Sequence, residues 1–216
     1  IPIGDSRPTS AETQKDAGTL ANKLRALAIA DRQNVVEEGT FRDSETLKER
    51  IEALRKLGYT IEILAIATPK EESRLGIFQR YETQHTAKVK NPRFVSVEFH
   101  DMAMEGFDKS LQKCQALVDR IRVINRSGEI LFDSASPKNR QASAYEAIAE
   151  GRKMSSQKLA KTALSWQEVK KMAIERNAPQ EYLKEIDAQI KHIDNLCRDK
   201  MFEKSRNCER DEGLMR

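Results

Sequence analysis

The segment 60–67 constrains the fold more than any other part of this sequence. It reads TIEILAIA, so six of its eight residues are apolar. Short, nearly continuous apolar runs of this kind are typical of strands. Segments with helical spacing lie on both sides of it, and a buried strand between two helices is typical of a parallel sheet covered on both faces. We therefore predict an α/β fold, a three-layer arrangement with a parallel sheet flanked by helices.

The spacing of apolar residues predicts the other elements of the first 137 residues. Helices are expected at 10–30, from Ser44 to just before Gly58, from Pro69 to about Ala87, and over 96–119. Strands are expected at 34–38, 121–125 and 130–132, and a tight turn at Ser127-Gly128 joins the last two as a hairpin.

Strand signals stop after Asp133, and the rest of the chain has helical spacing. We therefore predict a body at 1–137 and a helical extension at 138–216. The spacing Ser165-x-x-Glu168 predicts a capping box at the start of one helix. Asn177 and Pro179 predict the start of another. In that last helix a narrow apolar stripe could bind a partner, although such a stripe most often packs against its own domain; it consists of Leu183, Ile186, Ile190, Ile193 and Cys197.

Charge and cysteine content exclude several classes of protein. The 38 basic and 34 acidic residues are mixed along the chain and leave a net charge of +4. Because the basic residues form no stripe, the sequence does not predict a nucleic-acid partner. The three cysteines, Cys114, Cys197 and Cys208, are widely spaced and fit neither a disulfide framework nor a zinc site. No apolar run approaches the ~20 residues that span a membrane. We expect a soluble, cytoplasmic protein with no membrane partner.

The loop 38–42, expected at the end of a strand, is the first candidate binding segment. Functional loops of α/β folds lie at the carboxyl ends of strands. Gly39 allows close approach of a ligand, Glu38 can accept hydrogen bonds from sugar hydroxyls, and Thr40 can donate or accept. Arg42 can bind a phosphate. In the alternative interpretation, Arg42 is solvated and Glu38 only orients a helix.

Arg80 and Arg93 are the second candidate site. They lie on either side of a polar connection between two predicted helices, as two arginines of a phosphate-binding lid would. Planar guanidinium groups can stabilise the charge on a transferred phosphoryl group. Alternatively, Arg80 pairs with Glu82 or Glu72, and Arg93 is a solvated residue at a helix start.

His100-Asp101 could form an acid–base pair, but neighbouring helical residues point about 100° apart, which favours a packing or capping role. No dedicated cluster of metal ligands is visible, so the sequence predicts no protein-bound metal. Asp43, Asp101 and Asp133 could contact Mg²⁺ only through phosphates or water.

Several of these motifs, taken in order, resemble the zeta toxin family. They are Glu38-Gly39-Thr40-x-Arg42, then Arg80-Tyr81-Glu82-Thr83 with Arg93 and His100-Asp101 at the family's spacing, then Ile124-Asn125-Arg126 through Phe132-Asp133-Ser134. The resemblance covers roughly residues 13–134. It implies a P-loop kinase-like fold for the body.

Zeta toxins are kinases of toxin–antitoxin systems that use ATP and Mg²⁺ to phosphorylate the 3′-hydroxyl of the sugar in UDP-N-acetylglucosamine. The resemblance therefore implies that Glu38, Thr40 and Arg42 contact this nucleotide sugar. It implies that Arg80 and Arg93 bind the ATP phosphates and stabilise the transferred group. It also implies an antitoxin protein as a partner.

The sequence departs from the family pattern upstream of these motifs. No glycine is followed by lysine, so there is no G-x-x-x-x-G-K-[ST] phosphate loop, and the family's catalytic aspartate is absent as well. Asn22 stands where an acidic substrate contact is expected. We expect the parent protein to have about 70 or more further N-terminal residues, and these 216 residues alone to be inactive. The alternatives are a noncatalytic protein-interaction module built on a degenerate kinase body and the helical tail, and a different phosphotransferase with the same lid.

Overall fold

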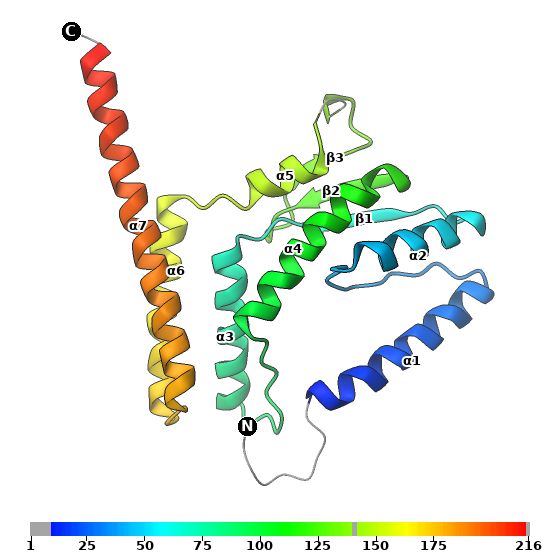
Figure 1. Ribbon diagram of the computed structural model, residues 1–216, viewed down its shortest axis with the longest axis horizontal. Helices are drawn as coiled ribbons and strands as arrows, with labels where there is room; N and C mark the ends of the chain where they lie inside the picture. The colour runs from blue at the N-terminus through cyan, green and yellow to red at the C-terminus, as the bar shows by residue number, and fades with distance from the viewer. Residues whose placement is uncertain (1–9, 140–141, 215–216) are drawn as a thin grey trace.

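The structure is a computed structural model that describes the backbone of residues 10–139 and 142–214, and the side chains of 16–139 and 142–202. Two pairs of helices are separated by one strand and followed by a pair of strands, and three helices come after them in the described chain (Figure 1). The helices are α1 (Ser10–Ala30), α2 (Ser44–Lys56), α3 (Lys70–Thr86), α4 (Val97–Cys114), α5 (Ala144–Gly151), α6 (Ser156–Glu175) and α7 (Gln180–Leu214). The strands are β1 (Glu62–Ile66), β2 (Arg120–Ile124) and β3 (Ile130–Asp133), and 3₁₀ turns occupy Gln115–Leu117 and Pro137–Asn139.

The described strands form a small mixed sheet in the order β1-β2-β3. β1 and β2 are parallel, with Ala65 opposite Val123, and β3 returns antiparallel to β2. The side chain of Asn125 shapes the tight turn, because its Oδ1 accepts hydrogen bonds from the amides of Ser127 and Glu129, both at 3.0 Å. Gly128 completes the turn with a φ of 84°, which glycine adopts without strain. The predicted parallel strand and the predicted hairpin are confirmed.

One face of the sheet is buried under α4 and α5. The cluster there combines strand residues with residues of these helices: Ala65, Ala67, Leu111, Ile121, Val123, Phe132, Ala144 and Ile148. On the opposite face, Leu64, Ile66 and Ile130 are each more than half exposed. The prediction that the 60–67 strand is covered on both faces is therefore wrong for the described residues. The mixed α/β class is confirmed, while a second helical layer over the sheet stays a prediction.

A second core lies between α3 and the two C-terminal helices. Its fully buried residues come from α3, α6, α7 and the α6–α7 connection: Leu75, Phe78, Trp166, Val169, Ala173, Ala178, Ile186 and Ile193. The apolar stripe predicted on the last helix thus packs within the chain, against α6 and α3. In Figure 1, α6 and α7 run side by side next to α3.

Two predictions of local structure are wrong. Residues 34–38 do not form a strand, because no described strand lies beside them to accept their backbone hydrogen bonds; Val36 is fully exposed. Residues 96–119 are not one helix, since α4 ends at Cys114 and a 3₁₀ turn leads into β2.

The predicted capping box at Ser165 is also wrong. Ser165 lies inside α6, whose buried positions continue past it, and Ser155 caps this helix by accepting a hydrogen bond from the Lys158 amide at 3.2 Å. A capping box does occur at α5, where the side chains of Ser143 and Glu146 each bond the other's backbone amide at 3.1 Å. Sequence spacing alone cannot separate these cases, because both pairs have the same pattern.

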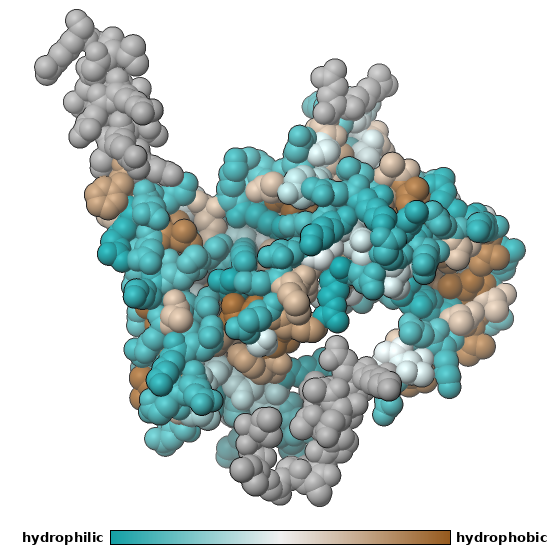
Figure 2. Space-filling view, in the orientation of Figure 1, coloured by the Kyte–Doolittle hydropathy of each residue, from teal (hydrophilic) through white to brown (hydrophobic). Residues whose placement is uncertain are grey.

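The described surface is mostly polar, as Figure 2 shows on one face of the molecule, with apolar residues at the edge where α1 and α2 end. Leu20, Leu24 and Leu27 of α1 are each more than half exposed, so the amphipathic pattern predicts this helix correctly but not the burial of its apolar side. Within the described ranges, none of the helices is long and apolar enough to cross a membrane.

Candidate functional site

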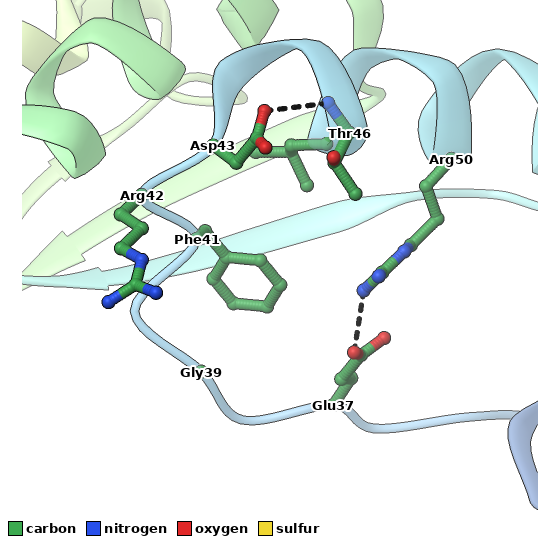
Figure 3. A pocket seen from close by; sticks show the side chains of 8 residues that line it. Glu37, Gly39, Phe41, Arg42, Asp43, Thr46 and Arg50 are labelled. Atoms are coloured by element: carbon green, nitrogen blue, oxygen red, sulfur yellow. Dashed lines mark hydrogen bonds and ion pairs between the residues drawn. The ribbon is translucent and has the colours of Figure 1, made fainter. Parts of the chain in front are cut away.

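A small open pocket of about 190 Å³ lies at the loop before α2. Glu37, Gly39, Phe41 and Arg42 line it from the loop, and Asp43, Thr46, Leu47 and Arg50 line it from the start of α2 (Figure 3). Most small-molecule sites have volumes of ~300–1,000 Å³. The pocket can therefore hold only part of a larger ligand.

Glu37 is fixed at the pocket by two arginines. Arg25 of α1 donates to its carboxylate at 2.9 Å, and Arg50 of α2 donates at 2.6 Å. Figure 3 shows Arg50 and Glu37 facing one another. The sequence interpretation chose the neighbouring Glu38, which is exposed and does not line the pocket. In a strand, neighbouring side chains point to opposite faces, which would distinguish Glu37 from Glu38. Because residues 34–38 are not a strand, the sequence alone gives no basis for choosing between the two glutamates.

Thr40 and Arg42 lie on the same loop with different surroundings. Thr40 is exposed and outside the pocket lining. Arg42 lines the pocket, and its guanidinium lies 4.4 Å from the centre of the Phe99 ring at the start of α4. Phe41, between them, has a φ of 45°, a left-handed conformation that a bulky residue rarely adopts.

Asp43 holds the start of α2. Its carboxylate accepts hydrogen bonds from the amides of Thr46 at 3.0 Å and Glu45 at 3.1 Å. These bonds to its charged form lower the pKa of Asp43 below its usual value. Asp43, the residue before the predicted helix start at Ser44, is therefore the cap residue, and its carboxylate is engaged by the amides of the first helical turn.

Arg80 and Arg93 are both exposed, and neither guanidinium has a hydrogen bond or an ion pair to another described residue. Arg80 lies on α3, and Gln84 lies one turn further on the same face. The amide of Arg93 donates to Oε1 of Gln84 at 2.6 Å, which holds the segment before α4 against this part of α3. The structure thus places the backbone of Arg93 beside the part of α3 that carries Arg80.

Glu82 has a different partner from the one considered in the sequence. Its carboxylate is 1% exposed and accepts two hydrogen bonds from Arg176, from Nε at 2.7 Å and from the terminal nitrogen Nη2 at 2.8 Å. The alternative in which Arg80 is neutralised by Glu82 is therefore wrong. Residues two apart on a helix point ~200° apart, so Glu82 faces the second core while Arg80 faces solvent.

His100 and Asp101 join α3 to α4. The imidazole Nδ1 of His100 lies 2.9 Å from Oδ1 of Asp101, and its Nε2 lies 2.8 Å from the hydroxyl of Ser73 on α3. Asp101 also pairs with Arg74, which donates from Nε at 3.1 Å, and with Lys70 at 2.9 Å. The two neighbouring side chains do hydrogen-bond one another, which the sequence interpretation considered uncommon.

The environment of Asp101 favours its charged form. Burial alone would raise the pKa of this carboxyl, but hydrogen bonds from Arg74, His100 and Lys70 outweigh burial and hold the pKa well below its usual range. Because Asp101 is already paired with two cations, it suits the role of a junction between helices rather than that of a catalytic base.

The start of α4 lies between the two candidate segments. Phe99, on its first turn, contacts Arg42 of the pocket loop, and Arg93 lies just before the N-cap residue Ser96. Within the part of the chain that the structure describes, no group of three or more His, Cys, Asp or Glu side chains could hold a metal ion.

Comparisons with known proteins identify relatives of this chain. The zeta toxin family profile matches residues 3–136. Toxin PezT of Streptococcus pneumoniae serotype 4 is 28% identical over 144 residues, which are 65% of this chain and 56% of PezT. Toxin zeta of Enterococcus hirae is 31% identical over 103 residues, 47% of this chain and 36% of that toxin. The chain thus spans between about a third and little more than half of these relatives.

A solved structure from the PezAT chromosomal toxin–antitoxin system of Streptococcus pneumoniae has a similar fold. It superposes with a TM-score of 0.57 over 75% of this chain and 63% of that one, at 23% identity. This likeness concerns the fold alone. The profile match covers more than half of the chain, and from it we conclude that the chain belongs to the zeta toxin family.

Proposed function

We propose that this chain is part of an ATP-dependent kinase that phosphorylates a nucleotide sugar, at the 3′-hydroxyl of the sugar of UDP-N-acetylglucosamine. The observation that carries the proposal is the pair Arg80 and Arg93. Both side chains are exposed, both lack a carboxylate partner among the described residues, and the backbone of Arg93 is bonded to Gln84, one turn from Arg80 on α3. Two unpaired cations on neighbouring segments are suited to an anion with several charges.

The residues present fit the phosphates of ATP, because the neighbouring carboxylate Glu82 is already paired with Arg176 and cannot neutralise Arg80. Arg80 and Arg93 would hold these phosphates and stabilise the transferred group. ATP, when bound, supplies that phosphoryl group. Mg²⁺ would be bound through phosphates or water, since the described residues form no ligand cluster for it.

The acceptor would bind at the loop before α2. Arg42 and the pocket beside it support this assignment, and Glu38 and Thr40 are exposed on the same loop, where they are accessible to sugar hydroxyls. A pocket of about 190 Å³ is too small for a whole nucleotide sugar, so part of that substrate would lie outside it.

The wider biological role rests on family membership. We propose that the protein acts in the cytoplasm as the toxin of a toxin–antitoxin pair, with an antitoxin protein as its partner. Residues 1–137 would form the kinase body, with a P-loop kinase-like fold of three layers in which helices flank a parallel sheet. Residues 138–216 would form its helical extension.

The product of the complete gene tests the proposal. Incubated with Mg²⁺-ATP and UDP-N-acetylglucosamine, it should form a phosphorylated nucleotide sugar that mass spectrometry detects. Arg80→Ala and Arg93→Ala should each lower kcat by about a thousandfold or more, as expected when a transition-state arginine is lost. Arg198→Ala is the matched control, because among the described residues Arg198 bonds to Asp194 and Asn195 of its own helix. Absence of turnover, or turnover unchanged in Arg80→Ala, would overturn the proposal.

A further inference from the structure

Each of the two candidate phosphate-binding arginines is followed directly by an aromatic residue whose ring contacts a ring of the second core. Tyr81 follows Arg80 and Phe94 follows Arg93. The two rings contact one another, with centroids 5.0 Å apart. The backbone that carries each guanidinium is therefore attached to one shared aromatic cluster.

The C-terminal helices build the rest of that cluster. The ring of Tyr182, on α7, lies 5.4 Å from Tyr81 and 5.6 Å from Phe94, between centroids. Phe78 of α3 stacks on Tyr182 at 5.5 Å and meets the ring of Trp166, on α6, at 4.9 Å. Tyr182 is the residue of α7 that contacts both aromatic neighbours of the arginines. Contacts between rings at these distances fix orientation as well as adding buried area.

Arg176 closes the cluster from the connection between α6 and α7. Its guanidinium forms two hydrogen bonds with the buried carboxylate of Glu82 and lies over two rings, 5.4 Å from the centre of Tyr81 and 5.2 Å from that of Tyr182. Glu82 belongs to the Arg80-Tyr81-Glu82-Thr83 motif. Arg176 and Tyr182 lie outside the residues that match the family, 3–136.

The geometry of this pair determines where Arg80 points. A planar guanidinium that bonds both carboxylate oxygens restrains the rotation of α3 about its axis, which a single hydrogen bond does not. With Glu82 turned into the core, Arg80 is turned to solvent. The contact between the rings of Phe94 and Tyr182 likewise restrains the backbone segment that carries Arg93.

We propose that Arg176 and Tyr182 are positioning residues, which hold Arg80 and Arg93 in one arrangement for binding the phosphates of the donor nucleotide. This inference rests on the proposed function and extends it: the C-terminal helices are part of the phosphate-binding machinery. Neither residue needs to touch the substrate, because each acts through the residue beside an arginine.

Three variants of the complete gene product separate positioning from general stability. Arg176→Met removes the guanidinium, and Arg176→Lys keeps the charge without its planar geometry. Tyr182→Leu keeps an apolar side chain and both members of the Glu82–Arg176 pair but removes the ring contacts, so it tests the cluster without leaving a buried carboxylate unpaired. Lys170→Met is the matched control, because it removes an ion pair between α6 and α7, Lys170 to Asp187 at 2.7 Å, outside the aromatic cluster.

Three measurements report on positioning. Hydrogen exchange follows the amides of residues 80–94, calorimetry follows the binding of inorganic triphosphate, and steady-state kinetics follow kcat and KM. In Arg176→Met and Tyr182→Leu we expect faster exchange at 80–94 and weaker triphosphate binding. We also expect kcat to be lower by about 10- to 100-fold, since a displacement of ~1 Å can cost a hundredfold. KM for the acceptor should stay unchanged, Arg176→Lys should be intermediate, and Lys170→Met should resemble the unmodified protein.

The results distinguish this inference from the proposed function. If the unmodified protein shows no turnover, the proposed function fails, whereas faster exchange and weaker triphosphate binding in Arg176→Met still support positioning. Folded Arg176→Met and Tyr182→Leu proteins with unchanged exchange and unchanged triphosphate binding would overturn the inference. A loss that Lys170→Met shares equally would overturn it too, because it would reflect stability alone.

Discussion

At the residue scale, Gly106 determines how closely the pocket loop approaches α4. A Cβ atom at this position would lie 2.8 Å from Cβ of Arg42 and 2.9 Å from its Cα, closer than such atoms pack. The backbone of Arg42 therefore rests on α4 at a place where only a hydrogen atom fits. This contact fixes the Cα and Cβ atoms of Arg42, whose side chain lines the pocket and lies over the Phe99 ring.

Gly106→Ala should displace the pocket loop from α4. We expect a loss of about 1–3 kcal/mol in the free energy of unfolding, because extra atoms in a packed contact force a backbone shift. Urea denaturation followed by circular dichroism measures this loss. Gly18→Ala is the control: a Cβ there meets no described atom within 4 Å, so replacing a helical glycine should stabilise by about 0.5–1 kcal/mol. Equal effects of the two substitutions would contradict the role of Gly106.

Residue-level roles could be predicted from the sequence only where partners are near in the chain. The sequence predicts Arg80 and Arg93 as a pair, and the Arg93 amide bonds Gln84 one turn from Arg80, while their role as phosphate ligands stays a prediction. The partner of Glu82 could not be predicted, because Arg176 is 94 residues away and any of the chain's many arginines would satisfy a buried carboxylate equally well. The packing of α6 and α7 on α3 makes the choice.

At the element scale, the junction between α3 and α4 depends on one carboxylate. Asp101 of α4 pairs with Arg74 and Lys70 of α3, while its neighbour His100 bonds Ser73 of the same helix. Arg74 also donates to Gln189 of α7 at 3.3 Å, so the junction reaches the C-terminal helices. The helices themselves were predictable from local periodicity. Residues 34–38 were mispredicted as a strand because a strand needs a partner that local sequence does not reveal.

The α3–α4 junction should weaken in acid. The pKa of Asp101 is lowered in the folded protein, so below the usual value of about 4 the unfolded chain binds more protons at this position. Its contribution is therefore fully present above about pH 5 and is lost as pH falls towards the folded-state pKa. Asp101→Asn should be less stable than the unmodified protein at pH 7, and the difference in urea midpoint should shrink by pH 3. A difference that stays constant with pH would contradict this role.

At the scale of the whole molecule, two cores divide the chain. The first core lies between the sheet and helices α4 and α5, and α4 also contacts the pocket loop at Gly106. The second core joins α3 to α6 and α7. The predicted boundary near residue 137 does not coincide with a division between these cores, because the sheet core includes Ala144 and Ile148 of α5 and the second core includes Leu75 and Phe78 of α3. The order of elements in the sequence could not reveal this arrangement, because the apolar face of α3 could pack equally well on the sheet or on the C-terminal helices.

Cavities made in the two cores should affect the arginine segment differently. Trp166→Ala and Ile148→Ala each empty a buried site, at residues 1% and 0% exposed, and should lower the free energy of unfolding by about 3–5 and 2–5 kcal/mol respectively. Of these two residues, Trp166 is the one that belongs to the aromatic cluster, through its contact with Phe78. Trp166→Ala should therefore accelerate hydrogen exchange at 80–94, whereas Ile148→Ala should accelerate it mainly in the β strands and α5. Equal acceleration at 80–94 in both variants would mean that the two cores open together, and that the C-terminal helices exert no separate control over Arg80 and Arg93.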